Sequence, residues 1–211
     1  MQNYNVSIPI KRGYMMYRFY LAAIDLLPGA MILIPIYFIL NRIYFRSARK
    51  SILCFLFSCY LAAVYVLVGL PNVTYIRPEV NLNLIPIAGM IDDWKNSILN
   101  VLLFVPLGIM LPILWNRFKT QRKTLLFSFG VSLVIELLQM LTYRATDVND
   151  LITNTLGAFL GFHCAKLFKK KDCLKSEDKT SEIIIVLGIV LLMMFFVYPF
   201  ASPALWDWIL L

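Results

Sequence analysis

The sequence predicts an all-α integral membrane protein, a helix bundle with about six transmembrane helices. Hydrophobic residues make up 60% of the 211 residues and charged residues only 15%, and the mean hydropathy is +0.75. A soluble domain is typically about 45–50% apolar, and a chain of this size could not bury so much apolar surface in one core. Apolar runs of about 20 residues recur along the chain, each long enough to cross the hydrocarbon core, with clusters of Lys and Arg between them.

The N-terminal membrane segment, 1–80, is predicted to hold an interfacial stretch followed by two spans. In chain order these are 1–18, 19–41 and 51–70. The first span contains an isolated acid, Asp25, and the pair Pro28 and Gly29, which favours a kink. The run is also too long for the apolar region of a signal peptide, so we expect it to stay in the membrane.

The remaining chain is predicted to form a membrane domain of four spans over 81–200, followed by a tail over 201–211. The four spans are expected at 97–115, 124–141, 151–168 and 183–200. Two tryptophans in the tail favour a position at the membrane interface. The stretch 81–90, NLNLIPIAGM, is too short to span and too apolar for solvent, which predicts an interfacial or re-entrant piece.

Lys and Arg are unevenly distributed among the connections, which predicts an orientation. The connections 42–50, 116–123 and 169–182 are rich in Lys, Arg or both, whereas 71–97 and 142–150 have only two and one such residues. The positive-inside rule therefore places the first set in the cytoplasm and the second outside it. Both chain ends then fall outside, unless the first segment is re-entrant and the N-terminus lies inside.

The charge and cysteine content exclude some partners and sites. We attribute the net charge of +8 to cytoplasmic loops that face anionic lipid, so membrane lipids are expected partners and nucleic acid is not. The four cysteines contain no CxxC pair and none falls in a predicted extracytoplasmic segment, which supports neither a disulfide framework nor a zinc site. We assign no metal ligands, and the sequence identifies no cofactor.

A polar cluster interrupts the apolar sequence between Ser132 and Gly161. Its members are Glu136, Gln139, Arg144, Asp147, Asp150 and Asn154. Charged groups inside hydrocarbon cost several kcal/mol or more, so ionisable residues there indicate a functional site. The predicted orientation brings the cluster to the headgroup boundary of the outer leaflet, together with Asn100 from the preceding span.

The spacing of the cluster predicts two helical faces that meet. The first face carries Ser132, Glu136, Gln139 and Tyr143, and the second carries Asp150, Asn154, Gly157 and Gly161. Gly157 and Gly161 form a GxxxG pattern, which lets another helix approach closely. The fourth span is joined to the fifth by a short turn and is the simplest partner, so we expect the Glu136 and Asn154 faces to meet.

Two interpretations of the cluster remain open. In the structural one, the polar side chains bond across helices, Arg144 forms a surface ion pair and Asp150 caps the fifth helix. In the functional one, Glu136, Asp147 and Asp150 are catalytic carboxylates acting as general acid or base, or holding a divalent cation beside a phosphate. The assigned ligand-binding residues are Asn100, Gln139, Arg144 and Asn154, and the assigned helix-packing residues are Pro106, Gly108, Gly157 and Gly161.

These motifs resemble the VanZ-like family of bacterial membrane proteins. The resemblance covers roughly 81–200 and rests on NLNLIPI, NSILNVLLFVPLG, SLVIELLQ and RATDVNDLITNTLGAFLG in this order. It implies a bacterial cell-membrane protein, in a family named after an accessory glycopeptide-resistance protein linked to teicoplanin. The resemblance implies no chemical mechanism.

Three functions are compatible with these observations. The protein could bind an envelope lipid or a lipophilic glycopeptide antibiotic at the outer leaflet and so affect antibiotic susceptibility. It could instead be an intramembrane enzyme that modifies a lipid-linked envelope precursor, or a small lipid transporter. We rank binding first, because an enzyme would be expected to show a nucleophile or metal ligands other than carboxylates, and a transporter would be expected to show an inverted repeat.

Overall fold

The protein is an all-α membrane helix bundle, as the sequence predicted. The computed structural model describes residues 27–78, 82–83, 94–142, 146–167 and 180–210. The elements in chain order are a helix Leu27–Phe45 that ends in the π-helix η1 (Asn41–Phe45), α2 (Ala48–Leu67), β1 (Leu82–Asn83), α3 (Trp94–Leu114), the 3-10 helix η2 (Asn116–Lys119), α4 (Gln121–Gln139), β2 (Thr146–Asp147), α5 (Val148–Leu167), α6 (Thr180–Leu192), the π-helix η3 (Met193–Val197) and α7 (Tyr198–Leu210).

Four of the described helices are long and apolar enough to cross a membrane. They are Leu27–Phe45, Ala48–Leu67, Trp94–Leu114 and Thr180–Ala204, and they correspond to four of the six predicted spans. The other two predicted spans are α4 and α5, with 19 and 20 residues. At 1.5 Å per residue these helices are also about 30 Å long, but they carry more polar residues, so six crossings remain a prediction.

The connection between the first two helices is shorter than the predicted loop 42–50. The first helix continues through η1 to Phe45, and α2 already begins at Ala48. Arg46 ends the first helix in a left-handed conformation with φ 48°, and its N–H donates to the Asn41 carbonyl at 2.9 Å. Most of the predicted loop is therefore helical.

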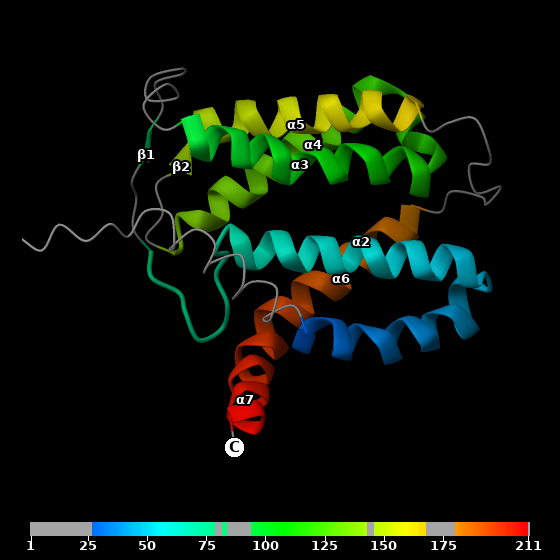
Figure 1. The fold of residues 1–211 in the computed structure, drawn as a ribbon, viewed down its shortest axis with the longest axis vertical. Helices are drawn as coiled ribbons and strands as arrows, with labels where there is room; N and C mark the ends of the chain where they lie inside the picture. The colour runs from blue at the N-terminus through cyan, green and yellow to red at the C-terminus, as the bar shows by residue number, and fades with distance from the viewer. Residues whose placement is uncertain (1–26, 79–81, 84–93, 143–145, 168–179, 211) are drawn as a thin grey trace, which may run out of the picture.

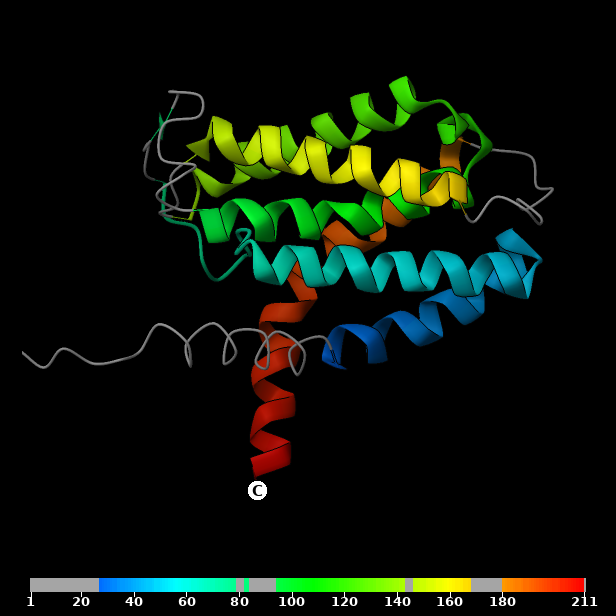
Figure 2. The ribbon, with the colours of Figure 1, turned by 45° about the horizontal axis from the view of Figure 1, so that its top comes forward.

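The helices form two groups that meet at α2 and α3. Helices α3, α4 and α5 pack together, and α2 packs against α3 on one side and α6 on another (Figures 1 and 2). Pro106 cannot donate a helical hydrogen bond within α3. Tyr60 of α2 donates its hydroxyl to the Leu103 carbonyl in the same part of α3, at 2.8 Å, which joins the two groups.

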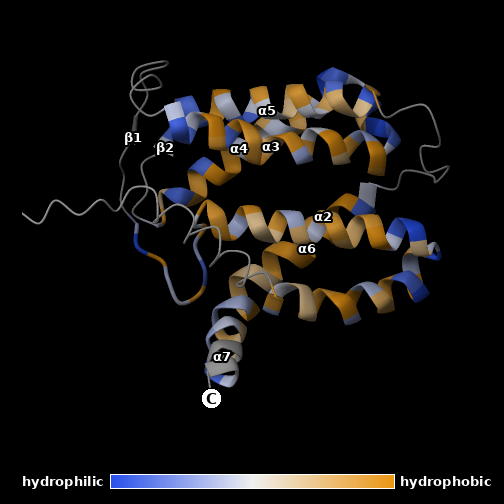
Figure 3. Ribbon diagram, viewed as in Figure 1, coloured by the Kyte–Doolittle hydropathy of each residue, from blue (hydrophilic) through white to orange (hydrophobic). Residues whose placement is uncertain are grey.

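The described connections between helices lie at the two opposite ends of the bundle. At one end β1 and β2 form a short parallel ladder, and the Arg77 N–H donates to the Leu141 carbonyl at 2.8 Å. At the other end, which carries the described Lys/Arg-rich connections, Arg117 donates to the Thr180 hydroxyl at 2.8 Å. Hydrophobic residues follow the lengths of the helices, and hydrophilic residues gather at the ends (Figure 3). This is the separation that the predicted sorting of the loops requires.

The C-terminal helix leaves the bundle. Helices α6, η3 and α7 are continuous from Thr180 to Leu210, and α7 runs across the direction of α2 and α3 (Figures 1 and 2). The predicted tail 201–211 is thus helical as far as it is described. Its position at the membrane interface stays a prediction.

Some predictions fall on residues that the structure does not describe. They concern the stretch 1–18, the start of the first span with Asp25, most of 81–90, Tyr143, Arg144 and most of the connection 169–182.

Candidate functional site

The polar faces of α4 and α5 meet inside the bundle. Ser132, Glu136 and Gln139 of α4 are all buried, with Glu136 only 3% exposed. On α5, Asn154 is 4% exposed and its Nδ2 donates to the Ser132 Oγ at 2.9 Å. This bond confirms the predicted contact between the two faces.

Glu136 holds the turn that leads into α5. Its Oε2 accepts the backbone N–H of Asp147 at 3.0 Å, and its backbone carbonyl accepts the Thr146 hydroxyl at 2.9 Å. A buried carboxylate that accepts a backbone N–H forms one of the stronger kinds of hydrogen bond. The carboxylate therefore positions the connection between α4 and α5.

Asp147 makes the capping contact at the start of α5. Asp147 directly precedes the helix, and its Oδ1 accepts the N–H of Asn149, the second helical residue, at 2.8 Å. This is the contact that an N-cap side chain makes. Asp150 lies in the first turn, where its negative charge suits the positive end of the helix. The interpretation of Asp150 as the N-cap was wrong by three residues, because Asp147 precedes the helix and Asp150 lies within it.

The two buried amides of the cluster each donate within the protein. Gln139 donates its Nε2 to the Val68 carbonyl at 3.0 Å and so ties the end of α4 to the end of α2. The amide oxygens of Gln139 and Asn154 are both buried and accept no hydrogen bond in the described structure. Asn100 is half-buried in the second turn of α3. The ligand-binding roles assigned to these residues stay predictions.

The small residues of α5 pack against α3, whereas the sequence suggested α4. A Cβ at Gly157 would lie 2.1 Å from the Val101 carbonyl oxygen, and one at Gly161 would lie 2.1 Å from that of Val105. On α3, a Cβ at Gly108 would lie 2.2 Å from the Ala158 carbonyl oxygen. A GxxxG pattern indicates a close approach but does not identify the partner. Here both glycines of α5 lie against the backbone of α3, with Gly161 opposite Gly108.

The described residues bring no three His, Cys, Asp or Glu side chains together in a way that could hold a metal ion. A catalytic role for Glu136, Asp147 and Asp150 is a separate prediction, and it remains one.

Comparison with known proteins identifies the family. The VanZ/LLP1 family matches residues 55–169. Over 119 residues the chain is 34% identical to Protein VanZ from Enterococcus faecium, an alignment that covers 56% of this chain and 71% of that protein. The chain belongs to the VanZ-like family. No solved structure matches it.

The VanZ-like match contains the whole α4–α5 hairpin and the α3 helix on which it packs. It begins within α2 and ends at residue 169, whereas the predicted VanZ-like domain ran over 81–200. The helix Leu27–Phe45 and helix α6 lie outside the match on either side. The candidate site therefore belongs to the part of the chain that is shared with the family.

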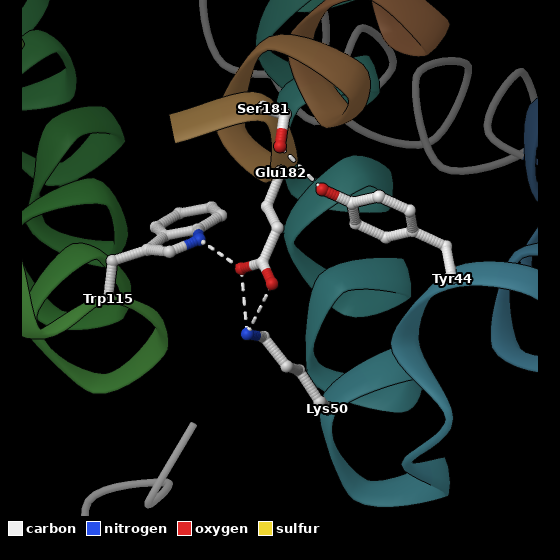
Figure 4. Close-up of polar contacts among 5 residues, drawn as sticks. All are labelled: Tyr44, Lys50, Trp115, Ser181 and Glu182. Atoms are coloured by element: carbon white, nitrogen blue, oxygen red, sulfur yellow. Dashed lines mark hydrogen bonds and ion pairs between the residues drawn. The ribbon is translucent and has the colours of Figure 1, made fainter. Parts of the chain in front are cut away.

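A second polar cluster joins the segments that flank the VanZ-like match. Lys50 at the start of α2 forms a buried ion pair with Glu182 at the start of α6, with its Nζ 2.7 Å from Oε1 and from Oε2 (Figure 4). The Trp115 indole N–H donates to Glu182 Oε2 at 3.2 Å, and Tyr44 and Ser181 share a hydrogen bond of 2.6 Å beside them. Lys50 is only 2% exposed.

The sequence-based interpretation missed this second cluster. Lys50 was grouped with the arginines that orient the chain, and Glu182 was placed in a Lys-rich connection. Each residue lies directly at the start of an apolar run. A charged residue at the start of an apolar run can be buried between helices, and this position was the signal that Lys50 and Glu182 could form an ion pair.

Proposed function

We propose that this VanZ-like protein binds an amphiphilic ligand of the cell envelope at the α4–α5 turn. The ligand would be a lipid or a lipophilic glycopeptide such as teicoplanin, and binding would alter antibiotic susceptibility. The observation that carries the proposal is the pairing of acidic groups with exposed apolar surface. Asp147 and Asp150 are half-buried at the end of the hairpin, and Glu136 is buried there. Leu137 of α4 and Ile152 of α5, close to these acids in the sequence, are 54% and 43% exposed.

This arrangement suits a ligand with a cationic or hydrogen-bond-donating head and an acyl tail. The carboxylates and the buried amide oxygens of Gln139 and Asn154 are acceptors. The apolar surfaces of α4 and α5 would shelter the tail within the bilayer. Binding is favoured over catalysis because Glu136 has a positioning role in the turn.

The proposed site faces the outside of the cell. The described Lys/Arg-rich connections lie at the opposite end of the bundle, joined by the contact of Arg117 with Thr180. By the positive-inside rule that end is cytoplasmic. The connections 71–97 and 142–150 would then be extracytoplasmic, where an envelope ligand or an antibiotic arrives.

Antibiotic susceptibility tests the proposal. Expression in a susceptible Gram-positive host should raise the inhibitory concentration of teicoplanin more than that of a glycopeptide without an acyl chain. Glu136→Gln should return it to the level of the empty vector. The change removes the negative charge but keeps an oxygen that can accept the Asp147 N–H. Loss of one charged hydrogen bond to the ligand, about 1.5–3 kcal/mol, corresponds to a loss of about 10- to 100-fold in affinity for that ligand.

The matched control is Ser128→Ala, on the same helix but further from the turn. Ser128 is buried and its hydroxyl has no hydrogen-bond partner in the described structure, so this variant should keep the wild-type susceptibility. Membrane levels of all variants are compared by quantitative blotting. The charge-based binding site would be refuted if cells with Glu136→Gln, present in the membrane at the normal level, were as resistant as cells with the unchanged protein. Equal effects of the unchanged protein on the two antibiotics would also refute it.

A further inference from the structure

A lipid-facing groove lies between the first two helices, away from the α4–α5 site. It has a volume of about 270 Å³, and its lining includes Ile34, Tyr37, Phe38, Asn41, Ser51 and Ile52. Ile34, Phe38 and Ile52 are 57%, 65% and 58% exposed. Both helices that form it are long and apolar enough to cross a membrane, so the acyl chains of the bilayer reach the groove.

The floor of the groove is closed by hydrogen bonds within the protein. Tyr37 shares a hydrogen bond with Ser58 at 2.6 Å, and Ser51 donates its hydroxyl to the Tyr37 carbonyl at 3.1 Å. The hydroxyls of Tyr37 and Ser51 thus each have a hydrogen-bond partner within the protein. Asn41 differs, because its buried Oδ1 accepts no hydrogen bond in the described structure.

The rim of the groove at the connection between the helices is strongly basic. Arg42, Arg46 and Arg49 are all exposed, and in the part of the chain that the structure describes none of them forms an ion pair with a carboxylate. The Arg42 guanidinium lies 5.7 Å from the centre of the Phe38 ring, which places its charge at the groove. Helix α2 begins here with no acidic residue in its first turn, so the positive end of its dipole also favours an anion.

We propose that this groove is a binding site for an anionic phospholipid of the surrounding bilayer. One acyl chain lies in the groove, and the headgroup phosphate lies among the three arginines. The site is independent of the proposed antibiotic or envelope-lipid site, which lies at the other end of the bundle.

Native mass spectrometry of the full-length protein in detergent tests this inference. The delipidated protein is titrated with phosphatidylglycerol or with phosphatidylcholine of the same acyl chains. We expect phosphatidylglycerol to bind at least about tenfold more tightly, since each basic residue at a membrane surface adds substantially to anionic-lipid attraction. Equal binding of the two lipids would overturn the proposal.

Two pairs of variants locate the binding. Ile52→Trp fills the groove and should abolish tight binding of phosphatidylglycerol, whereas Leu56→Trp, one turn along α2 at an exposed position outside the groove, should keep it. The triple change of Arg42, Arg46 and Arg49 to Gln should remove the preference between the two lipids. A control variant removes three positive charges at the same end of the bundle by changing Lys119, Arg122 and Lys123 to Gln. This control should keep the preference for phosphatidylglycerol.

The arginine variants decide the matter even if Ile52→Trp fails to fold, because the three side chains are exposed and lie outside the core. If both triple variants lose the preference equally, the attraction is only the general positive charge of this end, and the proposed site is wrong. If Ile52→Trp folds and binds phosphatidylglycerol like the wild type, the acyl chain does not occupy the groove.

Discussion

Replacing Gly157 or Gly161 with alanine is expected to force α3 and α5 apart and to lower the free energy of unfolding by about 3 kcal/mol or more. Overpacking a well-packed core typically costs about 1–3 kcal/mol. Here the new methyl carbon would lie 2.1 Å from a backbone carbonyl oxygen of α3 in each case. A backbone cannot move aside as a flexible side chain can, so the helices themselves must separate. Thermal or denaturant unfolding of the purified protein in detergent measures the effect.

Two other glycines provide matched controls for this experiment. A Cβ at Gly130 of α4 or Gly188 of α6 would meet no atom within 4 Å. Alanine at these positions should be neutral or slightly stabilising, because alanine favours helix by about 1 kcal/mol over glycine. If Gly157→Ala were as stable as Gly130→Ala, the close contact of α3 and α5 would be wrong.

Removing either partner of the buried ion pair is expected to destabilise the protein by about 3–5 kcal/mol, because the other charge stays buried without compensation. Glu182→Gln leaves Lys50 in the interior beside Trp115 (Figure 4). Arg49→Gln removes the same charge as Lys50→Gln from the neighbouring, exposed position and should cost less than about 1 kcal/mol. Unfolding in detergent compares the variants.

Exchanging the two charges tests whether the pairing itself, and not the identity of either residue, stabilises the protein. The double variant Lys50→Glu with Glu182→Lys should recover part of the stability that each single change loses. Recovery should be incomplete, because the Trp115 N–H then faces an ammonium group in place of its acceptor. If the double variant were as unstable as the sum of the two single ones, direct pairing would not explain the loss.

Local sequence signals predicted the helices well. The spans predicted at 51–70 and 97–115 correspond to α2 and α3, each displaced by a few residues at its ends. The length of an apolar run predicts such a helix without knowledge of its neighbours. The observed ends differ from the predicted ones because the helices extend into the polar residues on either side. The loop 42–50 was the clearest failure, since the first helix continues to Phe45 through a π-helical turn.

Contacts between distant segments were harder to predict. The meeting of Ser132 with Asn154 followed from helical periodicity and a short turn. The partner of Gly157 did not, because a small residue permits any helix to approach and only the packed bundle selects α3. The pairing of Lys50 with Glu182 joins positions 132 residues apart, and the sequence alone offers each charge a plausible place in solvent.

The proposed function depends most directly on which end of the bundle faces outward, and thiol accessibility on intact cells measures this. With the native cysteines replaced by alanine, a single cysteine is placed at Ile76, which is 48% exposed at the end tied to the α4–α5 turn by Arg77. The control is a cysteine at Lys119, exposed at the opposite end. The account predicts that a membrane-impermeant reagent labels the Ile76→Cys protein on intact cells and labels Lys119→Cys only after the cells are opened. Labelling of Lys119→Cys on intact cells, with Ile76→Cys labelled only after opening, would reverse the orientation and contradict an outward-facing site.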